Sequence, residues 1–184
     1  MSIFNTKWII IKIDKVKHGE FLYTIFTKDY WKIKCNKKIG KQEKILDLGY
    51  LINFEIVTKE NVSIHKISNI KILSEFNLEN KWFKEINNYL IILSIVLKKI
   101  PNWTPIFELF ELLETVNNIK NIDESKLILS KLKIISILWE LNEHHENEIT
   151  RKILKFINSN KIDKILKLVG INEGIKNKLN ELEF

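Results

Sequence analysis

The sequence contains no alanine, a single arginine (Arg151) and a single cysteine (Cys35) among its 184 residues. One cysteine excludes an internal disulfide and any zinc site built from several cysteines. The longest apolar run, residues 89–97, is too short to cross a bilayer, which requires about 20 residues. The N-terminal segment mixes lysine with isoleucine and lacks the basic start and apolar block of a secretory signal peptide. These features predict a cytoplasmic protein with no membrane segment.

Sequence patterns typical of enzymes are missing as well. The five glycines are scattered and form neither a dinucleotide-binding nor a phosphate-binding loop. No G-x-S-x-G nucleophile elbow occurs, and Cys35 has no base near it in the sequence, which predicts a small strand residue. Residues 143–146 (Glu-His-His-Glu) are rich in metal-ligand types, but adjacent histidines do not share one helix face. We interpret them as a solvated turn and expect no catalytic residue, metal or cofactor.

The positive charge is unevenly distributed along the chain. The net charge is +7, but lysine is favoured by A/T-rich codons, so its distribution is more informative than its total. Residues 1–75 contain 14 lysines and 8 acidic residues (14 − 8 = +6), whereas residues 76–184 contain 16 basic and 15 acidic residues (16 − 15 = +1). Codon bias acts on both parts alike. The excess in the first part therefore indicates a basic surface there, concentrated in residues 28–44.

The hydrophobic pattern changes from strand-like to helical near residue 75. Apolar and β-branched segments separated by short polar turns predict five strands. These are residues 8–13, 21–27, 31–38, 50–58 and 62–73. Apolar residues then recur at intervals of three and four, which predicts amphipathic helices. These are residues 79–99, 105–117, a helix capped by Asp123, and then 148–158, 163–169 and 172–182.

The order of these elements predicts an α+β protein with two parts. Residues 1–75 are expected to form an N-terminal five-stranded OB-fold β-barrel, since five short strands fit a small closed barrel better than a sandwich. Residues 76–184 are expected to form a C-terminal all-helical domain. No Pro/Gly/Ser-rich linker separates the two parts, so we expect them to pack together.

The basic segment combines lysines with aromatic residues, as single-stranded DNA sites do. Lysines neutralise phosphates, and aromatic faces stack on bases. In an OB-fold, the second and third strands carry the binding face, and this segment falls on the third. The alternative is that the aromatics fill the barrel and the lysines form a solvated face. The predicted DNA-binding residues are Tyr23, Lys28, Tyr30, Trp31, Lys32, Lys34, Lys37, Lys38, Lys41 and Lys44.

Several soft motifs follow one another in the first part of the sequence. They are Gly19-Glu20, Ile25-Phe26-Thr27, Lys32-Ile33 and the basic stretch 37–41. Together they resemble the N-terminal domain of the RecO family of bacterial recombination mediators. In the helical part, residues 106–113 and 132–142 look like the core helices of that family, and residues 153–182 resemble its last helices. The chain departs from the family in having Trp31 where glycine is usual. It also lacks the four-cysteine zinc module of many members.

The resemblance implies a role in DNA repair and recombination without an active site. It implies binding of single- and double-stranded DNA, annealing of complementary strands, and recombinase loading together with RecR. It also implies that the helical domain binds the acidic, hydrophobic C-terminal tail of single-strand-binding protein. A different hypothesis is a non-enzymatic protein–protein adaptor with an OB-type barrel, whose lysines mostly reflect codon usage. An adaptor would scatter its lysines among acids, whereas a mediator would gather them on one surface.

Overall fold

The computed structural model describes residues 2–28, 32–40, 43–58, 63–76, 81–100, 106–138 and 141–182. Five strands are followed by helices, which confirms the predicted α+β architecture. The strands are β1 (Ser2–Lys17), β2 (Glu20–Thr27), β3 (Lys32–Lys38), β4 (Leu51–Thr58) and β5 (Ile64–Ser74). The helices are α1 (Phe83–Lys99), α2 (Phe107–Asn117), α3 (Glu124–Ile137), α4 (Glu148–Ser159), α5 (Ile162–Ile165) and α6 (Glu173–Asn180).

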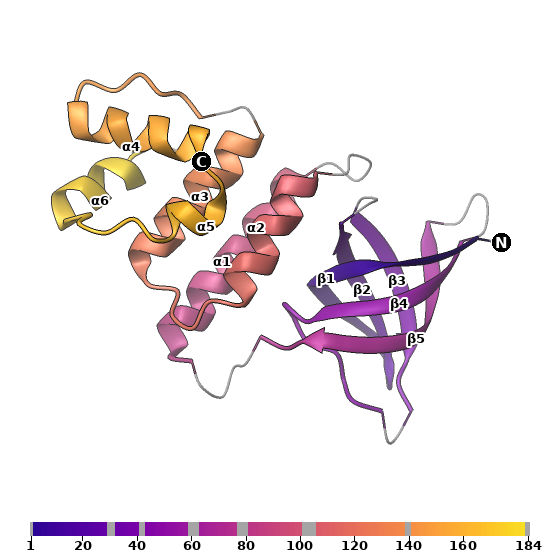
Figure 1. Cartoon of the computed structure of the whole chain (residues 1–184). Helices are drawn as coiled ribbons and strands as arrows, with labels where there is room; N and C mark the ends of the chain where they lie inside the picture. The colour runs from indigo at the N-terminus through magenta and orange to yellow at the C-terminus, as the bar shows by residue number, and fades with distance from the viewer. Residues whose placement is uncertain are drawn as a thin grey trace.

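The strands form a closed barrel in the order β1-β2-β3-β5-β4 (Figure 1). The long first strand closes it, because its first half pairs with β4 and its second half with β2, both antiparallel. Strand β1 therefore begins at Ser2, ahead of the apolar run at 8–13 that predicted it. Strands β3 and β5 pair in parallel, from Lys34 opposite Ile64 to Asn36 opposite Lys66. This order is compatible with an OB-type barrel.

Two hydrophobic cores are built on opposite faces of the same strands. Trp8 and Ile10 point into the barrel, where Trp8 stacks on Phe54 with ring centroids 4.5 Å apart. Ile9 and Ile11 point outward and belong to the core of the helical part. Successive side chains of a strand alternate between faces, so a strand buried on both faces needs a continuous apolar run. This double burial explains the apolar sequence of residues 8–11.

Three of the described helices, α3, α4 and α6, begin at a polar side chain that caps the helix. Asp123 accepts a hydrogen bond from the backbone N–H of Lys126 at 2.9 Å, which confirms it as the cap of α3. Asn147 and Asn172 cap α4 and α6 in the same way. The helix predicted at 163–169 is wrong in length, because α5 ends after one turn. The following residues form tighter i→i+3 bonds instead, such as Leu168 N–H to Ile165 O at 3.0 Å.

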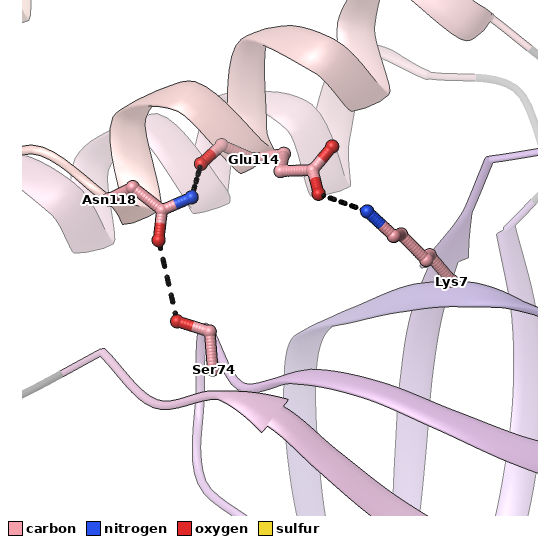
Figure 2. A network of polar contacts seen from close by, with 4 residues as sticks. All are labelled: Lys7, Ser74, Glu114 and Asn118. Atoms are coloured by element: carbon pink, nitrogen blue, oxygen red, sulfur yellow. Dashed lines mark hydrogen bonds and ion pairs between the residues drawn. The ribbon is translucent and has the colours of Figure 1, made fainter.

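The helical part packs directly on the outside of the barrel, with α1 and α2 lying between the barrel and the remaining helices (Figure 1). Polar contacts lie at the edge of the interface between the barrel and the helices (Figure 2). The Lys7 ammonium lies 2.8 Å from Glu114 Oε1. The Ser74 hydroxyl donates to Asn118 Oδ1 at 3.4 Å, and Asn118 Nδ2 donates to the carbonyl of Glu114 at 2.9 Å. The last turn of α2 and its C-cap residue thus contact both β1 and the end of β5.

Candidate nucleic-acid interface

Strand β3 separates apolar from polar side chains as its alternation predicts. Ile33 and Cys35 are buried inside the barrel, whereas Lys34 and Lys38 are exposed on its outer face. Burial raises the pKa of the Cys35 thiol, which keeps it in the unreactive protonated form. The interpretation of Cys35 as a small strand residue is confirmed, and the predicted wet face of β3 lies on the outside of the barrel.

Two of the predicted DNA-binding lysines instead face the helices. The Lys32 ammonium donates to the carbonyl oxygens of Leu97 and Ile100, at 2.9 and 2.8 Å, where α1 ends. The last carbonyls of a helix have no intrahelical partner, so they accept hydrogen bonds from this ammonium, although burial lowers the pKa of Lys32. The Lys28 ammonium lies 5.1 Å from the ring centroid of Phe107, at the start of α2. These two lysines thus contact the helical part and are not counted in the basic face described below.

Tyr23, another predicted DNA-binding residue, does not lie on the surface of the barrel. Its side chain is fully buried inside the barrel and has no area on which a base can stack. Burial, with a smaller effect of the Asp47 charge, raises the pKa of Tyr23 to about 12. The alternative interpretation of the aromatics as barrel core is correct for this residue.

Two further lysines are held in ion pairs at the loop between β3 and β4. Lys37 Nζ lies 3.0 Å from Glu43 Oε2, and this hydrogen bond lowers the pKa of Glu43. Lys44 pairs with Glu75 at the end of β5, and its hydrogen bond lowers the pKa of Glu75. Such partly exposed pairs contribute little stability, but each carboxylate offsets the charge that a phosphate would meet. Lys37 and Lys44 therefore contribute less positive potential than the sequence suggests.

Two of the predicted lysines, Lys34 and Lys38, are exposed on the outer face of β3, and Lys66 of β5 joins them. Lys34 and Lys38 lie on β3 on either side of Asn36, about 13 Å apart along the strand. Lys66 projects beside them, because β5 places it opposite Asn36 on the neighbouring strand, about 4.8 Å away. None of these three forms an ion pair with a residue that the structure describes. We call Lys34, Lys38 and Lys66 the β3–β5 basic face.

Lys66 is the residue that sequence reasoning missed. It lies in the predicted fifth strand, but the sequence does not show which strand pairs with which. The parallel pairing of β3 with β5 brings it to the basic face. Glu20 lies opposite Lys38, and its carboxylate binds Lys17 at 3.1 Å. Glu55 of β4 lies diagonally from Lys66 and accepts a hydrogen bond from Asn69 at 2.7 Å. Tyr30, Trp31 and Lys41, also predicted for this site, lie outside the described residues.

The histidine-rich segment at 143–146 forms a turn between α3 and α4. His145 Nδ1 accepts a hydrogen bond from the N–H of Asn147 at 3.0 Å, and Glu143 accepts one from Asn158. Both side chains are thus used in shaping the turn that precedes α4. Among the described residues, no group of three or more potential ligands could hold a metal ion.

The helical part contains a cavity of about 1100 Å³ between α2, α3 and the segment that joins α4 to α5. Its walls include apolar side chains, such as Phe107 and Ile137, and carry more acidic than basic groups. Lys133 lies at its edge, nearly buried, with its ammonium 3.2 Å from the carbonyl of Ile157. The charged residues of the lining are Glu108, Glu111, Glu114, Glu143, Asp163, Lys133 and Lys161.

The chain matches no protein-family model, and no curated protein is significantly similar to it in sequence. None of the helices in the described part of the chain has the length and apolar character needed to cross a membrane.

Proposed function

We propose that this chain is a non-catalytic DNA-binding protein that uses the β3–β5 basic face of its barrel to bind and anneal single strands. The observation that carries the proposal is the grouping of Lys34, Lys38 and Lys66, which have no ion-pair partner among the described residues. A barrel order compatible with the OB type supports it, since such barrels bind oligonucleotides.

Annealing requires no active site. Each lysine that contacts a phosphate releases condensed counterions, and a cationic surface lowers the repulsion between two strands held close together. The motifs that resemble RecO extend the proposal to a mediator of recombination and repair, which assists recombinase loading. By the same resemblance, RecR and the acidic tail of single-strand-binding protein are proposed partners. The cavity beside α2 is not proposed for that tail, because it carries five carboxylates against two lysines.

The experiment is a salt titration of the affinity for a labelled single-stranded oligonucleotide, measured by fluorescence anisotropy. The variant is Lys34→Gln/Lys38→Gln/Lys66→Gln. Each phosphate contact contributes about 0.7 to the slope of log K against log salt, so the slope should fall by about 2. The control is Lys155→Gln/Lys164→Gln/Lys167→Gln, which removes the same charge from exposed positions on the helical part and should keep the wild-type slope.

Equal slopes in the two triple variants would show that binding follows net charge and not this face. No binding of wild-type protein at low salt would remove the proposal and favour the adaptor hypothesis. The acidic, partly apolar cavity beside α2 is the feature that favours an adaptor, because it provides a site for a basic peptide.

A further inference from the structure

Two adjacent aromatic side chains stand almost fully in solvent where α1 begins. Trp82 is 82% exposed and Phe83 is 84% exposed. Further along α1, large side chains are packed inside the protein: Tyr89, Ile92 and Val96 are completely buried. Large aromatic side chains are usually at least partly buried, and a contiguous exposed apolar patch marks an interaction site. Packing within the described part of the chain therefore does not explain the placement of this pair.

The backbone that carries the pair is held in place. The Glu85 carboxylate accepts a hydrogen bond from the N–H of Trp82 at 2.8 Å, and the N–H of Glu85 donates to the carbonyl of Trp82 at 2.9 Å. These reciprocal bonds satisfy groups that a helix start leaves unpaired. The two rings thus project from a fixed helix end. Less conformational entropy is therefore lost when a ligand binds to them.

Lysines lie near the two rings in the sequence and on the neighbouring loop. Lys81 and Lys84 flank them in the sequence, and Lys84 is exposed. The Lys81 ammonium donates to the carbonyls of Ile119 and Lys120, at 2.7 and 3.2 Å, which brings the loop between α2 and α3 beside Trp82. The side chain of Lys120 is exposed on that loop. Neither Lys84 nor Lys120 forms an ion pair with any residue in the described ranges.

We infer that Trp82 and Phe83 form a second nucleic-acid site, which binds single-stranded DNA by stacking its bases on the two rings. Exposed aromatic faces among unpaired cations are the combination that binds single strands without sequence preference. A protein helix would instead favour a longer apolar groove with fewer charges. Lys84 and Lys120 would neutralise the phosphates that flank the stacked bases. The site lies on a different part of the chain from the β3–β5 basic face and goes beyond the proposed function.

The position of the Trp82 and Phe83 pair indicates which form of DNA it would favour. Lys32 of the barrel binds the C-terminal end of α1, whereas Trp82 lies at its N-terminal end. The 17 residues of α1 separate these ends by about 25 Å. The barrel face holds phosphates, which single and double strands share, whereas stacking on the pair requires unpaired bases. We therefore expect the pair to favour binding of single strands over duplexes.

The test compares single- and double-stranded oligonucleotides with the full-length variant Trp82→Ala/Phe83→Ala. We expect its affinity for single strands to fall by about 10-fold or more, with an unchanged salt slope, because stacking releases no counterions. Its affinity for the duplex should stay near the wild-type value. Trp82→Phe/Phe83→Tyr keeps both aromatic faces and should restore single-strand binding. Ile149→Ala/Val169→Ala removes exposed apolar side chains elsewhere and is the matched control.

Unchanged single-strand affinity in Trp82→Ala/Phe83→Ala would overturn the inference. An equal loss for single and double strands would also overturn it. Failure of the barrel proposal gives a different result, in which Lys34→Gln/Lys38→Gln/Lys66→Gln binds like wild type while the aromatic variant still loses single-strand affinity. Absence of DNA binding by the wild type would overturn both.

Discussion

The backbone of Gly49 lies directly against the ring of Tyr89, so that a Cβ at position 49 would be 2.5 Å from a ring carbon. Gly49 belongs to the loop that enters β4, and its N–H donates to the carbonyl of Ile10 at 2.8 Å. The Tyr89 ring also stacks on the ring of Phe76, with the two ring centroids 3.8 Å apart. The Tyr89 hydroxyl donates to Asn117 Oδ1 at 3.2 Å. A single tyrosine of α1 thus joins the barrel to two other segments of the interface.

Gly49→Ala should therefore destabilise the whole chain. The residue has φ +76°, a conformation that costs an L-residue about 1–2 kcal/mol, and the new methyl group would add overpacking of about 1–3 kcal/mol. Gly170→Ala is the matched control, since Gly170 has φ +82° but no atom within 4 Å of the added Cβ. Urea unfolding should show a clearly larger loss at position 49. Equal losses would mean that the contact with Tyr89 contributes nothing beyond backbone strain.

Much of the fold follows from the sequence because its signals are local. The alternation of β3 and the capping aspartate of α3 each depend on residues a few positions apart. Whether an individual lysine is exposed or bound depends instead on which segments, distant in the sequence, come into contact. Lys32 and Lys34 look alike in the sequence, yet one binds the end of α1, 65 residues away, and the other faces solvent. Lys66 joins the basic face only through a parallel pairing that no local pattern specifies.

Lys32 and Lys34 should consequently give opposite results when each is replaced by alanine. Lys32→Ala removes charged hydrogen bonds to two carbonyls at the end of α1 and should lower the free energy of unfolding by about 1–3 kcal/mol. Its salt slope for DNA binding should stay near wild type. Lys34→Ala should change stability by less than about 0.5 kcal/mol and lower the slope by about 0.7. Urea unfolding and the anisotropy titration measure both quantities; the reverse pattern would place Lys32 on the DNA surface.

Tyr23→Phe should leave the chain as stable as wild type or stabilise it by up to about 2 kcal/mol. The Tyr23 hydroxyl is buried and has no hydrogen-bond partner among the described residues, so removing it also removes a desolvation cost. Tyr89→Phe is the comparison, because that hydroxyl donates to Asn117 and its loss should cost about 1 kcal/mol. If thermal and urea unfolding showed Tyr23→Phe to be the more damaging of the two, Tyr23 would have a partner in the barrel.

The nearly buried Lys133 should make the chain more stable as the pH rises toward 10. Burial lowers the pKa of Lys133 below its ordinary value of 10.5, and the charge of Glu108 opposes this only in part. Between the lowered pKa and 10.5, the unfolded chain binds more protons at this residue than the folded chain does. The free energy of unfolding therefore increases with pH in this window. Lys133→Met removes this contribution, so its free energy of unfolding should increase less over the same pH range.

Urea unfolding at pH 8 and pH 10 would measure this difference. Lys32 and Lys81 also have pKa values lowered by burial, but they remain in both proteins and cancel from the comparison. Lys155→Met, an exposed replacement on α4, controls for the loss of one lysine and should follow wild type. Curves for wild type and Lys133→Met that stay parallel between the two pH values would contradict the prediction. The ammonium would then be as well solvated beside Ile157 as it is in the unfolded chain.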